Sequence, residues 1–256
     1  MRGMVAMSLV QRCFAKAKTM RYLMLLSTCS LLVFTGGVTG SGTTTSNAPA
    51  ASKFTPKLYT NLNSAIDVCL RDSPKGDCDA NPNGPMREWD MSKMRDLRAI
   101  FMGAASFNGD ISKWDVSHVT DMSGMFESAT SFNGDISTYD TSSCRDMSSM
   151  FFRSTNFNGD ITRWDVSSVT DMHSMFMSAS SFNRDVSHWD VSNVVNMDTM
   201  FMKAVSFSQR LCGAAWVNSR SSKMCMFCRS RGVLSTSICA TEASVTTAGK
   251  CACSET

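Results

Sequence analysis

The chain has 256 residues and a formal net charge of +3, but this charge is unevenly distributed. Residues 1–40 hold five basic and no acidic residues, whereas the stretch from Trp89 to Arg210 holds 15 acidic and 10 basic residues. This distribution excludes a nucleic-acid-binding function, because proteins of that class present a continuous basic surface.

Residues 1–40 form a predicted targeting segment. The five basic residues precede an uncharged run of 19 residues that ends at Gly40. A basic start, an apolar middle and small residues at Val38 and Gly40 are typical of a secretory signal peptide. The run also approaches the roughly 20 residues that a signal anchor needs to span a bilayer. Cleavage is the favoured alternative. In either case we expect an extracellular or cell-surface protein, which contacts the membrane only if residues 22–40 are retained.

Residues 41–57 are predicted to be a flexible Ser/Thr-rich spacer, and residues 58–88 an N-terminal helical cap. Leu62, Ala65, Ile66 and Cys69 follow the spacing of one helix face. Turn-rich sequence comes next and includes Cys78. In an oxidising compartment a disulfide between Cys69 and Cys78 would close this region into a lid over the first repeat.

Five units of 25 residues form the predicted repeat region, residues 89–213. The repeat is defined by columns of matching residues at this spacing. The aromatic column is Trp89, Trp114, Tyr139, Trp164 and Trp189. The two phenylalanine columns are Phe101, Phe126, Phe151, Phe176, Phe201 and Phe107, Phe132, Phe157, Phe182, Phe207. After Phe207 the pattern is expected to stop, because position 214 is Ala and the next tryptophan comes two residues late.

Each unit is predicted to hold one short helix and one short strand. Met122, Met125, Phe126 and Ala129 have helical spacing, which predicts a helix over residues 120–128 with this face buried. Phe132, Gly134 and Ile136 alternate with polar residues, which predicts a strand. The expected fold is therefore a mixed α/β, leucine-rich-repeat-like solenoid that is capped at both ends.

The stretch Phe-Asn-Gly-Asp-Ile-Ser-Lys-Trp-Asp-Val-Ser-His-Val-Thr-Asp-Met-Ser-Gly-Met-Phe, residues 107–126, resembles the BspA-like leucine-rich-repeat surface proteins. It is most similar to their 25-residue, Met-Phe-rich branch, long filed as a domain of unknown function in mycoplasma lipoproteins. The resemblance covers residues 62–239. It implies a surface-exposed solenoid with roles in adhesion or partner binding and no enzymatic activity. Tyr139, Cys144 and Arg184 depart from the pattern.

Aspartates also recur at the 25-residue spacing, and two explanations compete for them. Stacked carboxylates suggest a calcium site. Capping of turns and of the predicted helix start by the carboxylate oxygens explains the same residues without a metal and is favoured. We therefore expect no cofactor and no metal. The asparagines are expected to form an internal hydrogen-bond ladder, and they are Asn108, Asn133, Asn158 and Asn183.

Residues 214–256 are predicted to be a Cys-rich C-terminal cap and tail. Cys225 and Cys228 have the spacing of a redox pair or half a zinc site. No histidine follows His188 to complete such a site, so structural disulfides are favoured. A redox or metal-dependent function of the tail is the less favoured alternative.

No pattern of catalytic residues appears, because none of the three histidines pairs with a recurring nucleophile. We predict a non-enzymatic binding or adhesion protein whose partner is a protein or glycan at the cell surface. The predicted partner-binding column precedes the aromatic column and consists of Lys113, Thr138, Arg163 and His188. The alternative is a structural surface or wall component without a discrete ligand.

Overall fold

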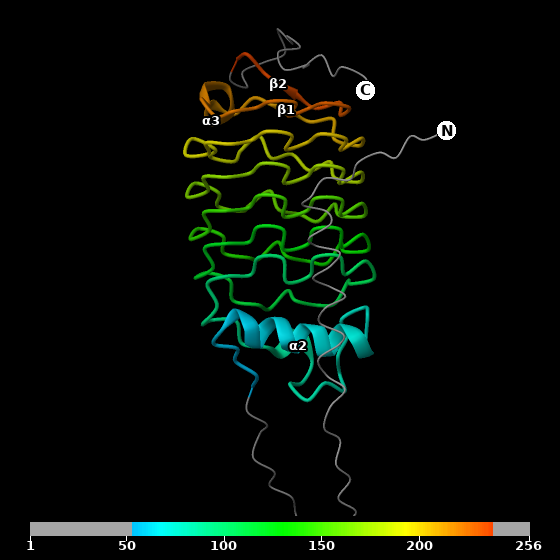
Figure 1. The fold of residues 1–256 in the computed structure, drawn as a ribbon. Coiled ribbons are helices and arrows are strands. Elements are labelled where there is room, and N and C mark those ends of the chain that lie inside the picture. Colours follow the sequence, from blue (N-terminus) through cyan, green and yellow to red (C-terminus); the bar gives the residue numbers. More distant parts are fainter. Residues whose placement is uncertain (1–52, 238–256) are drawn as a thin grey trace, which may run out of the picture. The chain divides into compact units, whose positions relative to one another are not determined.

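The computed structural model describes residues 53–237, and the chain divides into two compact units, residues 1–49 and 50–256. All described residues belong to the second unit. The predicted targeting segment, most of the predicted spacer and Cys239, Cys251 and Cys253 lie outside the described residues. The assigned elements are α2 (Tyr59–Asp72), the 3-10 helix η1 (Met86–Glu88), β1 (Arg210–Leu211), α3 (Ala214–Asn218) and β2 (Val233–Leu234) (Figure 1).

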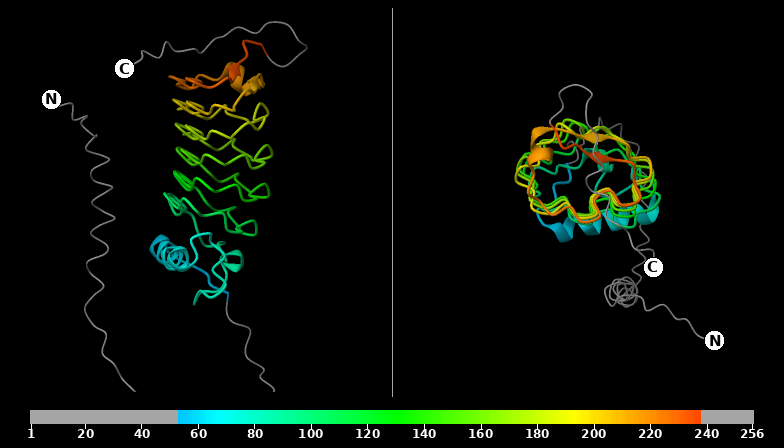
Figure 2. Two further views of the ribbon diagram at one scale, coloured as in Figure 1. Left: turned by 90° about the vertical axis from the view of Figure 1, so that its right-hand side faces the viewer. Right: turned by 90° about the horizontal axis from the view of Figure 1, so that it is seen from above.

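Between η1 and β1 the chain runs through successive coils that lie one above another (Figures 1 and 2). Parallel bridges join each coil to the next at the predicted spacing, through Asp96, Asp121, Asp146, Asp171, Asn196 and Ser222. Four backbone N–H groups of a coil donate to carbonyls of the following coil. In the first coil the donors are those of Leu97, Ala99, Phe101 and Gly103, with N···O distances of 2.7–3.0 Å.

The helix predicted over residues 120–128 is not formed. Gly124 and Ser128 have positive φ, 59° and 58°, and the equivalent residues of the other coils share this conformation. Positive φ interrupts a right-handed helix. Here it belongs to a backbone whose N–H groups at positions 122, 124, 126 and 128 point to the next coil. The predicted apolar face is still correct, because Met122, Met125 and Phe126 are completely buried.

The strand predicted over residues 132–136 is also absent. Phe132 and Ile136 are buried as expected. The link between coils at this place is made by a side chain, because the Asn108 Oδ1 atom accepts the N–H of Asn133 at 2.8 Å. Backbone-to-backbone pairing, which defines a strand, is therefore replaced by the asparagine ladder. The ladder itself is confirmed, but it runs along exposed and half-buried positions and not through the interior.

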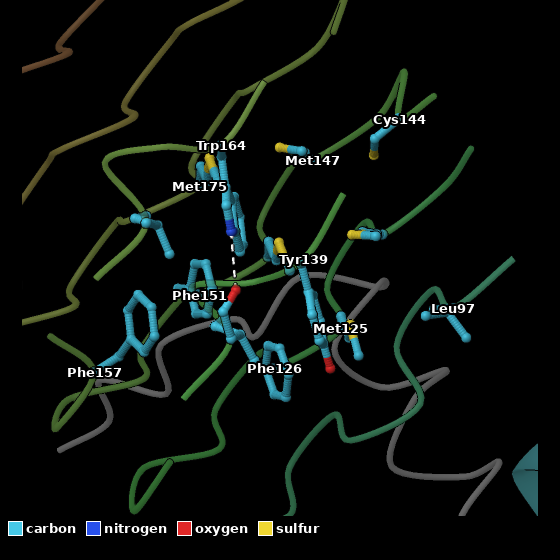
Figure 3. Packing of buried hydrophobic residues seen from close by; sticks show 14 of the residues in the cluster. Leu97, Met125, Phe126, Tyr139, Cys144, Met147, Phe151, Phe157, Trp164 and Met175 are labelled. Carbon is cyan, nitrogen blue, oxygen red and sulfur yellow. Dashed lines mark hydrogen bonds between the residues drawn. The ribbon is translucent and has the colours of Figure 1, made fainter. Parts of the chain in front are cut away.

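Stacked aromatic rings fill the centre of every coil. Along the column that contains Phe151, ring centroids of successive coils are 5.5–5.6 Å apart. Within one coil, Phe151 and Phe157 stack at 3.8 Å. Trp164 donates its indole N–H to the carbonyl of Ile136 in the preceding coil (Figure 3). Tyr139 makes the equivalent bond through its hydroxyl, which explains why tyrosine can replace tryptophan there.

The N-terminal end of the stack is closed by α2, whose buried residues are those predicted from the helical spacing. Cys69 and Cys78 lie at disulfide distance, with Cα atoms 5.4 Å apart. The loop between them places Gly76 against the ring of Phe107, where an added Cβ would approach the ring to 2.5 Å. The end of the predicted spacer is part of this cap, because Phe54 packs edge-on against Trp89 at 5.1 Å.

The predicted end of the repeat region at residue 213 is wrong, because a sixth coil follows. Phe227 stacks on Phe201 at 5.6 Å, and β1 pairs with β2 in parallel. Trp216 is completely buried and donates to the carbonyl of Val186 at 3.0 Å, as the other aromatic residues do. The short helix α3 carries Trp216 and accommodates its late position in the sequence.

Candidate functional site

The four residues of the predicted partner-binding column are all exposed. Each lies in a turn directly before a buried aromatic residue, so the burial of the aromatic ring turns the preceding side chain outward. The Thr138 Oγ1 atom donates to the carbonyl of Ser112 at 3.2 Å, which links the turns of adjacent coils. The structure therefore places Lys113, Thr138, Arg163 and His188 at the same turn of consecutive coils.

A cleft with a volume of about 660 Å³ lies beside the first member of this column. Lys53, Arg87, Glu88 and Lys113 line it together with backbone of the cap. The Arg87 guanidinium already pairs with Asp79 at 2.8 Å. The cleft thus adds one free ammonium group, that of Lys53, to the end of the column at Lys113.

Two rows of aspartates flank the column, and their carboxylates cap turns. In each turn the Oδ1 atom accepts the backbone N–H two residues later, and in several it also accepts the hydroxyl of that residue. Asp115 does this with Ser117, at 3.1 Å from the N–H and 2.7 Å from the hydroxyl. Asn196 caps its turn in the same way at 3.0 Å, which shows that the Oδ1 atom matters and not the charge. These contacts confirm the capping interpretation of the aspartates.

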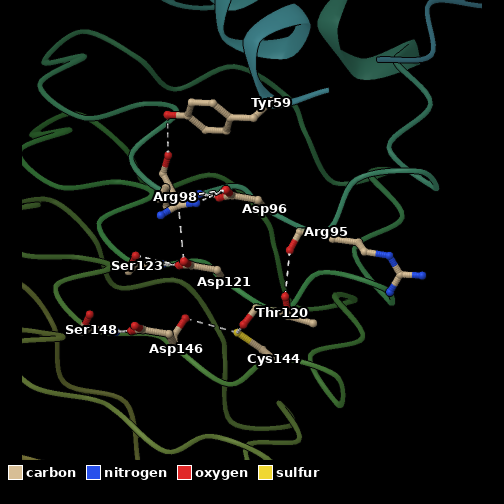
Figure 4. A network of polar contacts seen from close by, with 10 residues as sticks. All are labelled: Tyr59, Arg95, Asp96, Arg98, Thr120, Asp121, Ser123, Cys144, Asp146 and Ser148. Atoms are coloured by element: carbon tan, nitrogen blue, oxygen red, sulfur yellow. Dashed lines mark hydrogen bonds and ion pairs between the residues drawn. The ribbon is translucent and has the colours of Figure 1, made fainter. Parts of the chain in front are cut away.

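A third row of aspartates carries the parallel bridges between coils (Figure 4). Asp121 accepts the N–H of Ser123 at 2.9 Å and its hydroxyl at 2.6 Å. Arg98 pairs with Asp96 at 2.6 Å and lies 3.9 Å from Asp121, while the Tyr59 hydroxyl of α2 donates to the Arg98 carbonyl. This row therefore connects the cap to the first two coils.

Hydrogen bonds hold the pKa of six carboxyl groups below the ordinary value of 3.8. The side-chain hydroxyl two residues later is the largest cause, and the backbone N–H of that residue is the next. The six are Asp90, Asp110, Asp115, Asp135, Asp140 and Asp160. A lowered pKa in the folded state stabilises the fold above the ordinary value, and this stabilisation is lost as the pH falls through the folded-state pKa.

We expect the melting temperature to fall steeply when the pH drops below 3.8, and Asp140 tests the cause. Asp140→Asn keeps the Oδ1 acceptor, so its melting temperature at pH 7 should match the parent. Asp140→Ala removes the cap and should lower the free energy of unfolding by about 1 kcal/mol. Thermal denaturation between pH 2 and pH 7, followed by circular dichroism, checks both. Equal losses in the two variants at pH 7 would show that charge, not capping, matters.

Other titratable groups in the described part of the chain offer little chemistry. Cys144 is buried, and this burial raises the pKa of its thiol to about 12. His173 lies with Nδ1 at 3.0 Å from the Asp171 carboxylate within one turn. Between residues 53 and 237, no three His, Cys, Asp or Glu side chains are grouped so that they could hold a metal ion. Cys225 is half-buried and Cys228 is buried.

One exposed feature was missed by the sequence analysis. Directly after the buried Phe column, each coil turns a side chain outward, and in four coils it is apolar. These residues are Met102, Phe152, Met177 and Met202. The signal was present in the repeat alignment, because this column varies between Met, Phe and Glu while its neighbour is always Phe. The predicted helix concealed it.

The family described as "Mycoplasma protein of unknown function, DUF285" matches residues 76–162 and again residues 136–238. The two matches together cover well over half of the chain. The chain belongs to this family. The second match extends through the sixth coil, in agreement with the packing of Trp216 and Phe227. No curated protein and no solved structure matches the chain.

The family description names no activity and no ligand, so membership places the chain among repeat proteins of unknown function. Within residues 53–237 no helix is both long and apolar enough to cross a bilayer. The two matches overlap over residues 136–162, which lie in the middle of the stack of coils.

Proposed function

We propose that the chain is a BspA-like, leucine-rich-repeat-like solenoid that binds a protein or glycan outside the cell without catalysing a reaction. One observation carries the proposal. Four side chains of different chemistry, those of Lys113, Thr138, Arg163 and His188, are exposed at the same turn of consecutive coils. Repeat proteins recognise partners through such stacked variable positions.

The neighbouring positions of this turn already have structural roles, which leaves the column as the variable part. In the second coil, for example, Asp135 caps the turn through Ser137, and Tyr139 is buried and bonded to Ile111. Substitution at an exposed position without such contacts changes stability little. The column can therefore vary in chemistry from coil to coil while the fold is kept.

The charges around the column favour a polar, uncharged ligand. Lys113 and Arg163 stand between the two aspartate rows, so cations and carboxylates alternate over a short distance. A strongly acidic polymer would be repelled by the carboxylates, and a strongly basic one by the cations. Hydroxyl-rich glycans and neutral polar protein surfaces satisfy both sets of groups, and we place the ligand in this class.

A glycan array and a panel of immobilised cell-surface proteins, probed with the fluorescent full-length chain, test the proposal. The triple variant Lys113→Ala, Arg163→Ala, His188→Ala should lose binding by about tenfold or more. Its matched control replaces the same three residue types at other exposed positions: Lys93→Ala, His118→Ala, Arg145→Ala. Equal binding by both variants would refute the column. Absence of binding by the parent, together with high copy number at the cell surface, would favour a structural component instead.

A further inference from the structure

The outward-facing column after the buried phenylalanines forms a continuous strip in coils three to five, which consists of Phe152, Met177 and Met202. These residues are in register, because the N–H of Arg153 donates to the Met177 carbonyl and that of Ser178 to the Met202 carbonyl, at 2.9 and 2.8 Å. All three side chains are partly exposed. The other outward positions described above hold mostly Asp, Asn, Ser and Thr, so this strip differs in chemistry from them.

The residues beside the strip leave its side chains accessible. Ser149, Ser174 and Thr199 occupy the column three residues earlier in the sequence and are small. The Ser174 hydroxyl lies 3.7 Å from the Met177 sulfur, so the two columns are adjacent on the surface. A row of small residues next to a row of large apolar ones forms a shallow apolar step. Methionines in such positions adapt to different partner side chains.

The strip is bordered by cations without carboxylate partners. Arg153, Lys203 and Arg229 follow it by one residue in their coils, and no carboxylate of the described residues lies within 4.0 Å of them. The Arg153 guanidinium lies over the Phe152 ring at 4.9 Å. Glu127 is the only carboxylate in either column, and it is half-buried. The border therefore complements negative charge on a partner.

The spacing of the coils suits one partner conformation. Ring centroids of Phe151, Phe176 and Phe201, which directly precede the strip residues, are 5.6 and 5.5 Å apart. An α-helix rises about 5.4 Å per turn. A helix that lies along the stack therefore meets each coil with one side chain per turn, whereas an extended chain repeats at about 6.6–6.8 Å per side-chain pair.

From these observations we propose that the strip Phe152–Met177–Met202, with Arg153, Lys203 and Arg229 beside it, is a docking site for an amphipathic helix of a partner protein. The apolar stripe of that helix packs on the methionines and the phenylalanine. Acidic residues on both sides of the stripe pair with the cations. This surface is separate from the column at Lys113, and the inference does not depend on the proposed function.

The test uses a designed helical peptide of about 18 residues with Leu at one position per turn and Glu on both sides of this stripe. Fluorescence anisotropy with the full-length chain should show binding that weakens with added salt. Arg153→Glu with Lys203→Glu should weaken binding by about tenfold or more. The control Lys93→Glu with Arg145→Glu changes the charge equally at other exposed positions and should bind as the parent does.

Two further variants separate the apolar contribution from charge and from folding. Met177→Gln with Met202→Gln should weaken binding by about tenfold while thermal melting shows a folded protein. Glu127→Met should tighten binding by about threefold to tenfold, because it joins Met102 to the strip and makes the apolar column continuous. The triple variant at Lys113, Arg163 and His188 should bind the peptide as the parent does, so this result is independent of the proposed ligand column.

The proposal is overturned if the peptide binds no better than a scrambled peptide of the same composition, or if a version with Lys in place of Glu binds equally well. It is also overturned if Arg153→Glu with Lys203→Glu leaves the affinity unchanged. Self-association of the chain that this double variant abolishes, without any peptide binding, would assign the strip to a second copy of the chain instead.

Discussion

Replacing Phe151 by alanine is expected to lower the free energy of unfolding by about 3–5 kcal/mol. Its ring is completely buried and stacks on Phe126 at 5.5 Å, on Phe176 at 5.6 Å and on Phe157 at 3.8 Å. The cavity would lie in the third coil, at the middle of the stack. Because each coil contacts mainly its neighbours, the loss should also reduce cooperativity, and urea denaturation should show a broader transition.

The neighbouring residue provides a matched control for this prediction. Phe152 has the same side chain but faces outward, where it contacts Arg153. Phe152→Ala should therefore cost about 1 kcal/mol or less. Denaturation curves of the two variants, measured side by side, decide the orientation of both columns. A Phe151→Ala variant that unfolds at the same urea concentration as the parent would contradict the buried assignment.

Replacing Trp216 by alanine should be comparably severe, with a loss of about 3–5 kcal/mol. Trp216 is completely buried at the C-terminal end of the stack, and its indole N–H donates to the Val186 carbonyl. Alanine would open a cavity above the fifth coil and leave that carbonyl without its donor. Differential scanning calorimetry of the full-length chain measures the effect.

A second substitution at the same site separates packing from hydrogen bonding. Trp216→Phe keeps an aromatic ring and removes the donor. It adds a smaller packing loss to the roughly 1 kcal/mol of the hydrogen bond. A sixth coil requires the order alanine, then phenylalanine, then parent in increasing stability. If Trp216→Ala melts at the parent temperature, residues 214–218 do not belong to the cooperative stack.

The aspartate turns explain how one short motif can recur several times within each coil. Asp110, Asp115 and Asp121 each cap a turn through a serine two residues later. Each cap satisfies a backbone N–H locally, so the chain can reverse direction without a helix or strand. Side chains supply part of the hydrogen bonding that secondary structure supplies in most folds, which is consistent with the scarcity of helices and strands between residues 89 and 209.

The glycines at the two ends show how the phenylalanine columns are closed. Gly76 lies against Phe107 below the first coil, and Gly232 lies against Phe207 near the sixth. At both places an added Cβ would overlap the ring. Gly76 also has a φ of 96°, which side-chain-bearing residues rarely adopt. These two glycines let backbone approach the outer rings of the column and protect them from solvent.

The sequence alone determined the period of the repeat, the inward direction of its columns and the buried face of α2. These follow from the spacing of apolar residues, because burial of apolar side chains imposes a period on any backbone that satisfies it. The aspartate caps and the asparagine ladder were predictable for a related reason. Short polar side chains bond to nearby backbone whatever the larger fold is.

Only the tertiary structure decided the backbone conformation, the sixth coil and the outward strip. The spacing of Met122, Met125 and Phe126 fits a helix as well as it fits the observed turns. The choice between them depends on the next coil, whose carbonyls accept the N–H groups that a helix would use internally. Hydrogen bonds between residues about 25 positions apart leave no local signal in the sequence. For the same reason, the exposure of Phe152 and Met177 became visible only when the coils were placed side by side.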